Sequence, residues 1–240
     1  FSNSWGPSSV DNSYDSTADS FILNHKDSVV LFAAGNDGPY AHTVSGAANG
    51  KNAIAVGASE NFRPDTLSVS EDSDKLADFS SRGPTANGRI KPDVVEIGEE
   101  VYSVKAESIG ASDSNVYNQT RFVDNDNDGT ADYQSMSGTS MACPHAAGDA
   151  ALIRQYLRDE YGYSNLNMRG DLIKALMIYG SEDMGYGYPS YQQGWGRVNI
   201  KNIVNPPAPR SYKIFENTGS YTKTINVRSD EARLKAVMTY

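Results

Sequence analysis

The chain has 240 residues, 38% of them hydrophobic, so it can bury one sizeable core and part of a second. Acidic residues outnumber basic ones by 30 to 21, and the net charge of −9 argues against nucleic acid as a partner, because phosphate binding needs clustered Lys and Arg. The single cysteine, Cys143, excludes an intrachain disulfide and a multi-cysteine metal cage. No apolar run approaches the roughly 18 residues of a membrane span.

The first half of the chain alternates a helical stretch with short apolar runs. Residues 16–26 ("STADSFILNHK") predict a helix. The continuous apolar runs at 28–38 and 52–59 predict strands buried on both faces, as in a parallel sheet. Two shorter strands are predicted within 92–98 and 100–104.

The second half begins with helical periodicity. Alanine and aliphatic residues recur at helical spacing from Thr139 to about Tyr161, and alanine is the best helix former. Residues 168–180 predict a second helix, with one face made of Leu172, Ala175, Leu176 and Tyr179. Alternating strands and helices predict an α/β sandwich with a mostly parallel sheet.

A domain boundary is predicted at "NPPAPR", residues 205–210, whose three prolines forbid both a helix and a central strand. The residues beyond it alternate Tyr, Ile, Val and Thr with polar residues, which is typical of an antiparallel β-domain. We therefore expect one domain over residues 1–205, and a linker with the beginning of a β-sandwich or barrel domain over 206–240.

The segment "MSGTSMACPHAAG" places Ser140 at the first turn of the predicted helix from Thr139. A serine hydroxyl becomes a nucleophile only when a base removes its proton and donors receive the charge that develops on the substrate. The alternative is that Thr139 or Ser140 only caps the helix. A hydrolase elbow, G-x-S-x-G, is disfavoured because Ala142 occupies its last position.

Four segments, in this order along the chain, resemble the subtilisin-like serine peptidases. "NSWG" looks like the family's substrate-pairing strand, "FAAGNDG" like its oxyanion-asparagine segment, "FSSRGP" with "GRIKPDV" like the bridge between them, and "GTSMACPHAAG" like its serine motif. The resemblance covers about residues 1–204 and implies a three-layer α/β sandwich with a mostly parallel sheet. The end of that region is similar to alkaline subtilases in which a small β-barrel follows the catalytic domain.

The resemblance also implies an activity: a secreted serine endopeptidase that cleaves polypeptide substrates through an acyl-enzyme on Ser140. Asn36 would donate its side-chain amide to the oxyanion, together with the Ser140 backbone N–H. The substrate-binding residues implied by the resemblance are Ser4, Trp5 and Gly6 on one side of the primary pocket, and Ala33, Ala34 and Gly35 on the other.

The catalytic Asp and His motifs of this family, D-[ST]-G and H-G-T-H, are absent from the 240 residues. His145 follows Ser140 by five positions, which on a helix is roughly 140° around and about 7.5 Å along, so we expect it to point away. The expectation is a C-terminal part of a catalytic domain, inactive in isolation, whose base lies in a missing N-terminal part. The alternative is a catalytically inactive peptide-binding module in which only the groove survives.

The segment "DNDNDGTAD", residues 124–132, has the alternating oxygen ligands of a calcium loop. Its carboxylates stand at positions one, three, five and nine, with glycine at position six, and they are Asp124, Asp126, Asp128 and Asp132. Ser135 stands at position twelve, where such loops have a glutamate. We expect a structural calcium ion here; the alternative is a solvated turn.

One loop departs from the family pattern. Glu96 and Ile97 stand where the pattern has Ala-Pro before a glycine, in the segment "PDVVEIG". We assign no catalytic role to this loop, but its geometry is expected to differ.

Overall fold

The computed structural model of the chain describes residues 1–7, 14–62, 72–105, 122–123, 132–164, 168–205 and 237. Its centre is a parallel sheet in which the strands follow the order β1-β2-β3-β4. The strands are β1 (Ser2–Asn3), β2 (Leu31–Ala33), β3 (Ile54–Ser59) and β4 (Val94–Ile97). The strands predicted from the apolar runs are thereby confirmed, and β1 is an addition.

Side chains of the central strands alternate between two cores, as the period of two in a strand requires. Leu31, Ile54 and Val56 enter the larger core, under the helices α2 (Thr139–Tyr161), α3 (Gly170–Gly180) and α4 (Ile200–Val204). Phe32 and Ala55 enter the smaller core on the opposite face, beside α1 (Asp15–Asn24). Both faces of β2 and β3 are therefore covered, which explains their continuous apolar sequences.

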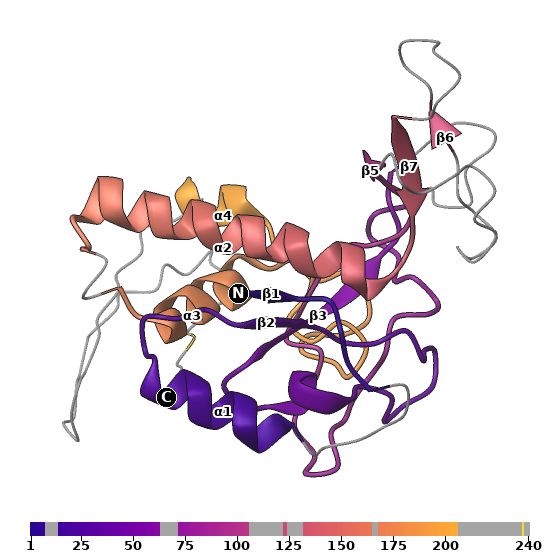
Figure 1. The fold of residues 1–240 in the computed structure, drawn as a ribbon, viewed down its shortest axis with the longest axis horizontal. Helices are drawn as coiled ribbons and strands as arrows, with labels where there is room; N and C mark the ends of the chain where they lie inside the picture. The colour runs from indigo at the N-terminus through magenta and orange to yellow at the C-terminus, as the bar shows by residue number, and fades with distance from the viewer. Residues whose placement is uncertain are drawn as a thin grey trace, which may run out of the picture.

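Helices complete the three layers on the two faces of the sheet (Figure 1). The helix α2 packs against β2, β3 and β4, while α1 packs against the short 3₁₀ helix η1, which contacts β2 and β3. This arrangement confirms the α/β fold with a mostly parallel sheet. The helices are α1 (Asp15–Asn24), η1 (Gly46–Asn49), α2 (Thr139–Tyr161), α3 (Gly170–Gly180) and α4 (Ile200–Val204).

The long helix α2 approaches the sheet closely because its buried face is made of small side chains. Ala142, Cys143 and Ala146 are fully buried against the sheet, and larger Ile153 and Leu157 follow toward the other end. The helix ends at Gly162, whose backbone is left-handed, with φ of 67°. The small face brings the first turn of α2 down onto the ends of β3 and β4.

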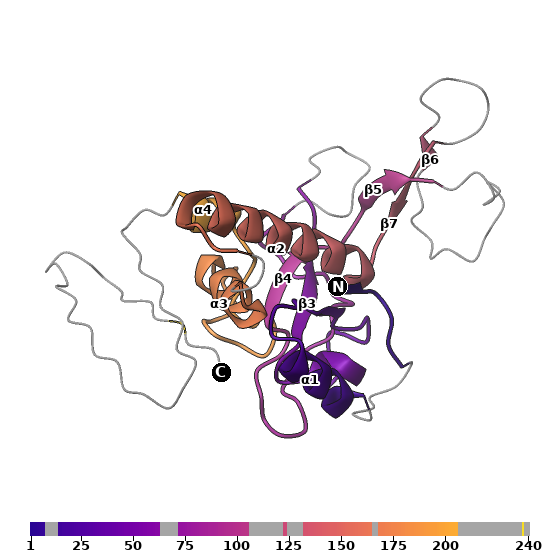
Figure 2. The same ribbon diagram turned by 60° about the vertical axis from the view of Figure 1, so that its left-hand side comes forward.

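A second, antiparallel sheet precedes α2 and has the strand order β5-β7-β6. Its strands are β5 (Val101–Val104), β6 (Phe122–Val123) and β7 (Tyr133–Met136), and Figure 2 shows them standing away from the parallel sheet beyond the start of α2. The sequence predicted β5 but neither β7 nor β6. The predicted linker and antiparallel domain, residues 206–240, lie outside the described residues except for Val237.

Candidate active site

The side chain of Asn36 lies at the first turn of α2. Its Oδ1 accepts hydrogen bonds from the backbone N and from the Oγ1 of Thr139, both at 2.9 Å. Its Nδ2 lies beside Gly138, 3.4 Å from the position that a Cβ would take there. The carboxamide is thus fixed by its oxygen, and its nitrogen is presented next to the turn that leads into Ser140.

Thr139 joins two loops through one buried hydroxyl. Its Oγ1 donates to Asn36 and accepts a bond of 3.2 Å from the backbone N of Gly35, and the residue is 1% exposed. An isolated donor or acceptor in such a place would cost about 1–3 kcal/mol. The hydroxyl therefore fixes the loop after β2 relative to the start of α2, an interaction that the sequence did not reveal.

The residue at the N-cap of α2 is Gly138, which makes no side-chain cap. Its φ of 156° is one that residues with a side chain rarely adopt, and its N donates to the Gly98 carbonyl at 2.8 Å. The N–H of Thr139 at the helix start is satisfied by Asn36 instead. The alternative in which Thr139 or Ser140 serves only as the cap is therefore wrong.

Ser140 is partly exposed at the start of α2, and its backbone carbonyl has a partner outside the helix. In a regular helix that carbonyl accepts from the N–H four residues later, which here is Pro144 and carries no hydrogen. The Oγ of Ser4 donates to the Ser140 carbonyl at 2.8 Å in its place. The segment after β1 is thereby tied to the first turn of α2.

The two segments predicted to bind substrate follow the carboxyl ends of the neighbouring strands β1 and β2. Trp5 is 60% exposed, packs edge-on against Phe32 with ring centroids 5.6 Å apart, and donates from Nε1 to Asn3 Oδ1. Gly6 is exposed and has open space around it. The residues at the end of β2 and directly after it are small and partly or fully buried: Ala33, Ala34 and Gly35.

The three histidines are engaged elsewhere. His145 Nδ1 lies 2.9 Å from the Ile97 carbonyl, and His25 stacks on Phe21 with ring centroids 4.2 Å apart. His42 lies in a loop, at a positive φ of 63°. Within the described part of the chain, no hydrogen bond joins Ser140 to a histidine.

A pair of carboxyl groups, Glu96 of β4 and Asp149 of α2, connects the sheet to the helix. Burial raises the pKa of Glu96 to about 8, and the hydrogen-bonded carboxyl of Asp149 adds to that rise. Burial also raises the pKa of Asp149, which the Glu96 hydrogen bond and His145 partly oppose. Both carboxyl groups therefore hold their protons to higher pH than isolated carboxyl groups do. In the sequence, the one sign of this pair was the acidic Glu96 inside an apolar strand.

The predicted calcium ligands Asp124, Asp126 and Asp128 lie outside the described residues. Asp132 is described just before β7, and its backbone carbonyl accepts from the N of Lys105 at 2.8 Å. Across the described ranges, no three His, Cys, Asp or Glu side chains cluster as metal ligands would. In the same ranges, no helix has the length and apolarity to cross a lipid bilayer.

A family model and two related proteins point to the same family for this chain. The model of the subtilase family matches residues 1–196. The serine protease AprX of Bacillus subtilis is 35% identical over 176 residues, which are 73% of this chain and 35% of AprX. Pyrolysin of Pyrococcus furiosus is 30% identical over 190 residues, 72% of this chain and 12% of pyrolysin. The chain thus spans about a third or less of the length of these two relatives.

Solved structures support the same fold at lower sequence identity. A lanthipeptide protease superposes with a TM-score of 0.56 at 16% identity, over 80% of this chain and 54% of that one. The prenylagaramide maturation protease PagA superposes with a TM-score of 0.53 at 19% identity, over 79% of this chain and 54% of that one.

Proposed function

Because the chain belongs to the subtilase family, we propose that it is the serine-bearing part of a subtilisin-like serine endopeptidase. In this proposal the Ser140 hydroxyl attacks the scissile carbonyl of a polypeptide and forms an acyl-enzyme. The Asn36 amide and the Ser140 backbone N–H stabilise the oxyanion. Extended substrate pairs with residues 4–6 and 33–35.

The observation that carries the proposal is the fixed orientation of the Asn36 carboxamide. Two bonds from Thr139 hold Oδ1, so Nδ2 is the end that remains to act as a donor. A donor that is already oriented needs no reorganisation when charge develops, which is why such groups contribute several kcal/mol in acyl transfer. The positive end of the α2 dipole acts in the same direction.

In this proposal the general base comes from polypeptide outside these 240 residues, since neither of the family's Asp and His motifs occurs within them. The parallel sheet offers a place for it. Among the described strands β1 pairs only with β2, so its other edge is open, and Phe1 at its start is 70% exposed. A parallel strand of the base-bearing polypeptide is expected to add at this edge.

The second candidate is a catalytically inactive peptide-binding module. The engagement of His145 with the Ile97 carbonyl favours it, because none of the histidines, all of which are described, is hydrogen-bonded to Ser140. The presence of both Asn36 and Ser140 favours the enzyme, since binding alone requires neither group.

A fluorophosphonate probe, which labels activated serines, separates the two functions. The chain alone is expected to label at no more than background rate. After addition of a subtilase segment that carries D-[ST]-G and H-G-T-H, labelling is expected at Ser140 and is lost in Ser140→Ala. Rapid labelling of the chain alone would contradict an external base. Peptide binding without labelling in the complemented protein would favour the binding module.

Two further properties belong to the same proposal. A calcium ion at residues 124–132 fits the hard oxygen donors of that segment and would stiffen the approach through β7 to Ser140. Secretion is consistent with an enzyme that cleaves polypeptides and is stabilised by calcium.

A further inference from the structure

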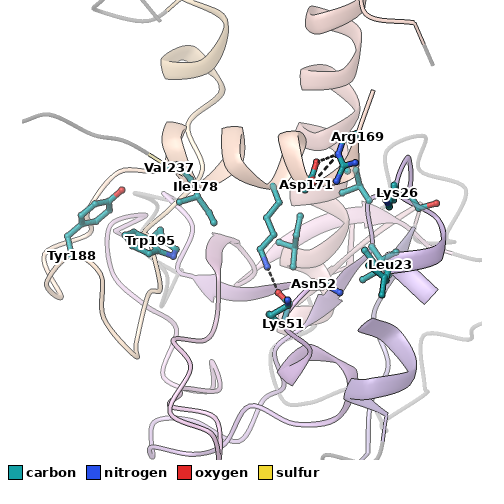
Figure 3. A pocket seen from close by; sticks show the side chains of 17 residues that line it. Leu23, Lys26, Lys51, Asn52, Arg169, Asp171, Ile178, Tyr188, Trp195 and Val237 are labelled. Atoms are coloured by element: carbon teal, nitrogen blue, oxygen red, sulfur yellow. Dashed lines mark hydrogen bonds and ion pairs between the residues drawn. The ribbon is translucent and has the colours of Figure 1, made fainter. Parts of the chain in front are cut away.

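A cavity of about 450 Å³, shown in Figure 3, lies at the amino ends of the strands of the parallel sheet. Val29 and Val30 precede β2, and Ile54 begins β3, so these lining residues mark the amino ends of the strands. Ser140 and Asn36 gather beyond the carboxyl ends. The cavity is therefore separate from the proposed active site, and its volume falls in the range of about 300–1,000 Å³ typical of small-molecule sites.

One end of the cavity is apolar. Ile178, Tyr188, Trp195 and Val237 lie together at that end in Figure 3, and Tyr188 packs edge-on against Trp195 with ring centroids 5.7 Å apart. Ile178 is 6% exposed and belongs to the larger core. An alkyl or aromatic group placed here would leave water without requiring the walls to move.

The other end carries positive charge. Lys26 and Arg169 lie there, and the Gly170 N–H donates to the Lys26 carbonyl at 2.7 Å, so the two cations are neighbours in space. Asp171 pairs with Arg169 at 2.5 Å and is the one acidic residue in the lining. Lys26 is exposed, and no described residue pairs with its ammonium group.

Two more lysines line the middle. Lys174 is neutralised by Asp93, with 3.1 Å between Nζ and Oδ1, and it also donates to the Lys51 and Ala53 carbonyls. Lys51 is the fourth cationic side chain of the lining. Asp171 compensates Arg169 and Asp93 compensates Lys174, so the excess of positive charge at the cavity comes from the remaining lysines, in a protein whose net charge is −9. Such local charge attracts anions and repels cationic ligands.

We propose that this cavity binds an amphipathic carboxylate, with the carboxylate at the Lys26 end and the apolar part toward Trp195. The cavity has positive charge at one end and apolar surface at the other, which matches a ligand with a carboxylate and an apolar part. A neutral oil would leave the charged end unused, and a small polar anion would leave the apolar end unused. A free fatty acid and the carboxyl terminus of a hydrophobic peptide share this amphipathic chemistry. Val237 of the C-terminal segment already forms part of the apolar wall, so the ligand would bind beside that residue.

Tryptophan fluorescence provides the test, because the chain has two tryptophans and Trp5→Phe leaves Trp195 as the reporter. The full 240-residue W5F chain is titrated with octanoate and, separately, with N-acetyl-Leu-Phe. The controls are octanol and the same peptide with an amidated end. A saturable change in Trp195 fluorescence with either carboxylate supports the site if that carboxylate binds at least about tenfold more tightly than its neutral control. This ratio of dissociation constants corresponds to about 1.4 kcal/mol. The carboxylate that meets this condition identifies the source of the ligand.

Charge-reversal variants show whether the recognition is local. Lys26→Glu is expected to weaken carboxylate binding about tenfold and to leave octanol binding unchanged. Lys201→Glu makes the same change of net charge on α4, outside the lining, and is expected to leave both unchanged. Absence of a response to both carboxylates, equal affinity for octanol and octanoate, or equal losses in the two variants would overturn the proposal.

Discussion

Replacing Glu96 by Gln is expected to stabilise the protein in alkaline solution. The carboxyl group sits between β4 and α2, is 8% exposed, and shares a hydrogen bond with Asp149. Arg197 is the cation that acts on it, and His145 faces its partner Asp149. Burial and the second carboxyl together make the ionised form of Glu96 unfavourable in the folded state.

The magnitude follows from the pKa of Glu96, which rises from 4.5 to about 8 on folding. Below pH 4.5 the group is protonated in both states and costs nothing. As pH rises from 4.5 to about 8, the folded state retains the proton that the unfolded state loses, so the free energy of unfolding decreases. At about 1.4 kcal/mol per pKa unit, the full penalty above pH 8 is up to about 5 kcal/mol.

The assay is urea denaturation of wild type and Glu96→Gln between pH 4 and pH 9. We expect equal stability near pH 4, where the carboxyl and the amide are both neutral, and a gain for E96Q at pH 9 that approaches the full ionisation penalty of up to about 5 kcal/mol. Glu160→Gln, at an exposed position of α2, is the control and should follow the wild-type profile. A difference between wild type and E96Q that does not grow with pH would refute the reasoning.

Three further predictions concern the approach to the site. Thr139→Val is expected to lower the free energy of unfolding by about 2 kcal/mol in urea denaturation, because Asn36 Oδ1 loses one of its two donors and the Gly35 N–H loses its acceptor; Thr139→Ser should stay close to wild type. Ser4→Ala is expected to cost about 1 kcal/mol in the same assay, and much less in a Pro144→Ala background, where the helix regains its own N–H donor. Excess EGTA is expected to lower the melting temperature through residues 124–132, and an unchanged melt would count against calcium there.

The layers of the fold could be predicted from the sequence because burial on both faces leaves a local signature. The apolar runs that became β2 and β3, and the small-residue periodicity of α2, each lie within one continuous segment. The sheet β5-β7-β6 gave no such signature. The β7 sequence "YQSM" alternates weakly, and its register is fixed by pairing with β6 and with β5, which lies some thirty residues earlier along the chain.

The candidate site was predicted in part. The segments around Asn36 and Ser140 could be identified from the sequence, because the resemblance to subtilisin-like peptidases is carried by contiguous segments. The contacts of Thr139 with the Asn36 loop could not be predicted, because they join residues about a hundred positions apart that meet only after the sheet forms. The same holds for the bond from Ser4 to the Ser140 carbonyl.

The Asn36 carboxamide has two roles: its oxygen stabilises the start of α2, and its nitrogen is proposed to donate to the oxyanion. Two substitutions can separate these roles. Asn36→Asp keeps an oxygen for both Thr139 donors, and a negative charge is favoured at the start of α2. It removes the N–H that would face the oxyanion, so peptide hydrolysis by the complemented protein should fall about 10²–10³-fold, as loss of one such donor does in subtilisin, a protein of the same family. Asn36→Ala removes both functions and should also lose about 1–2 kcal/mol of stability. If Asn36→Asp hydrolyses peptides at the wild-type rate, the amide has no part in catalysis and its orientation serves only to cap the helix.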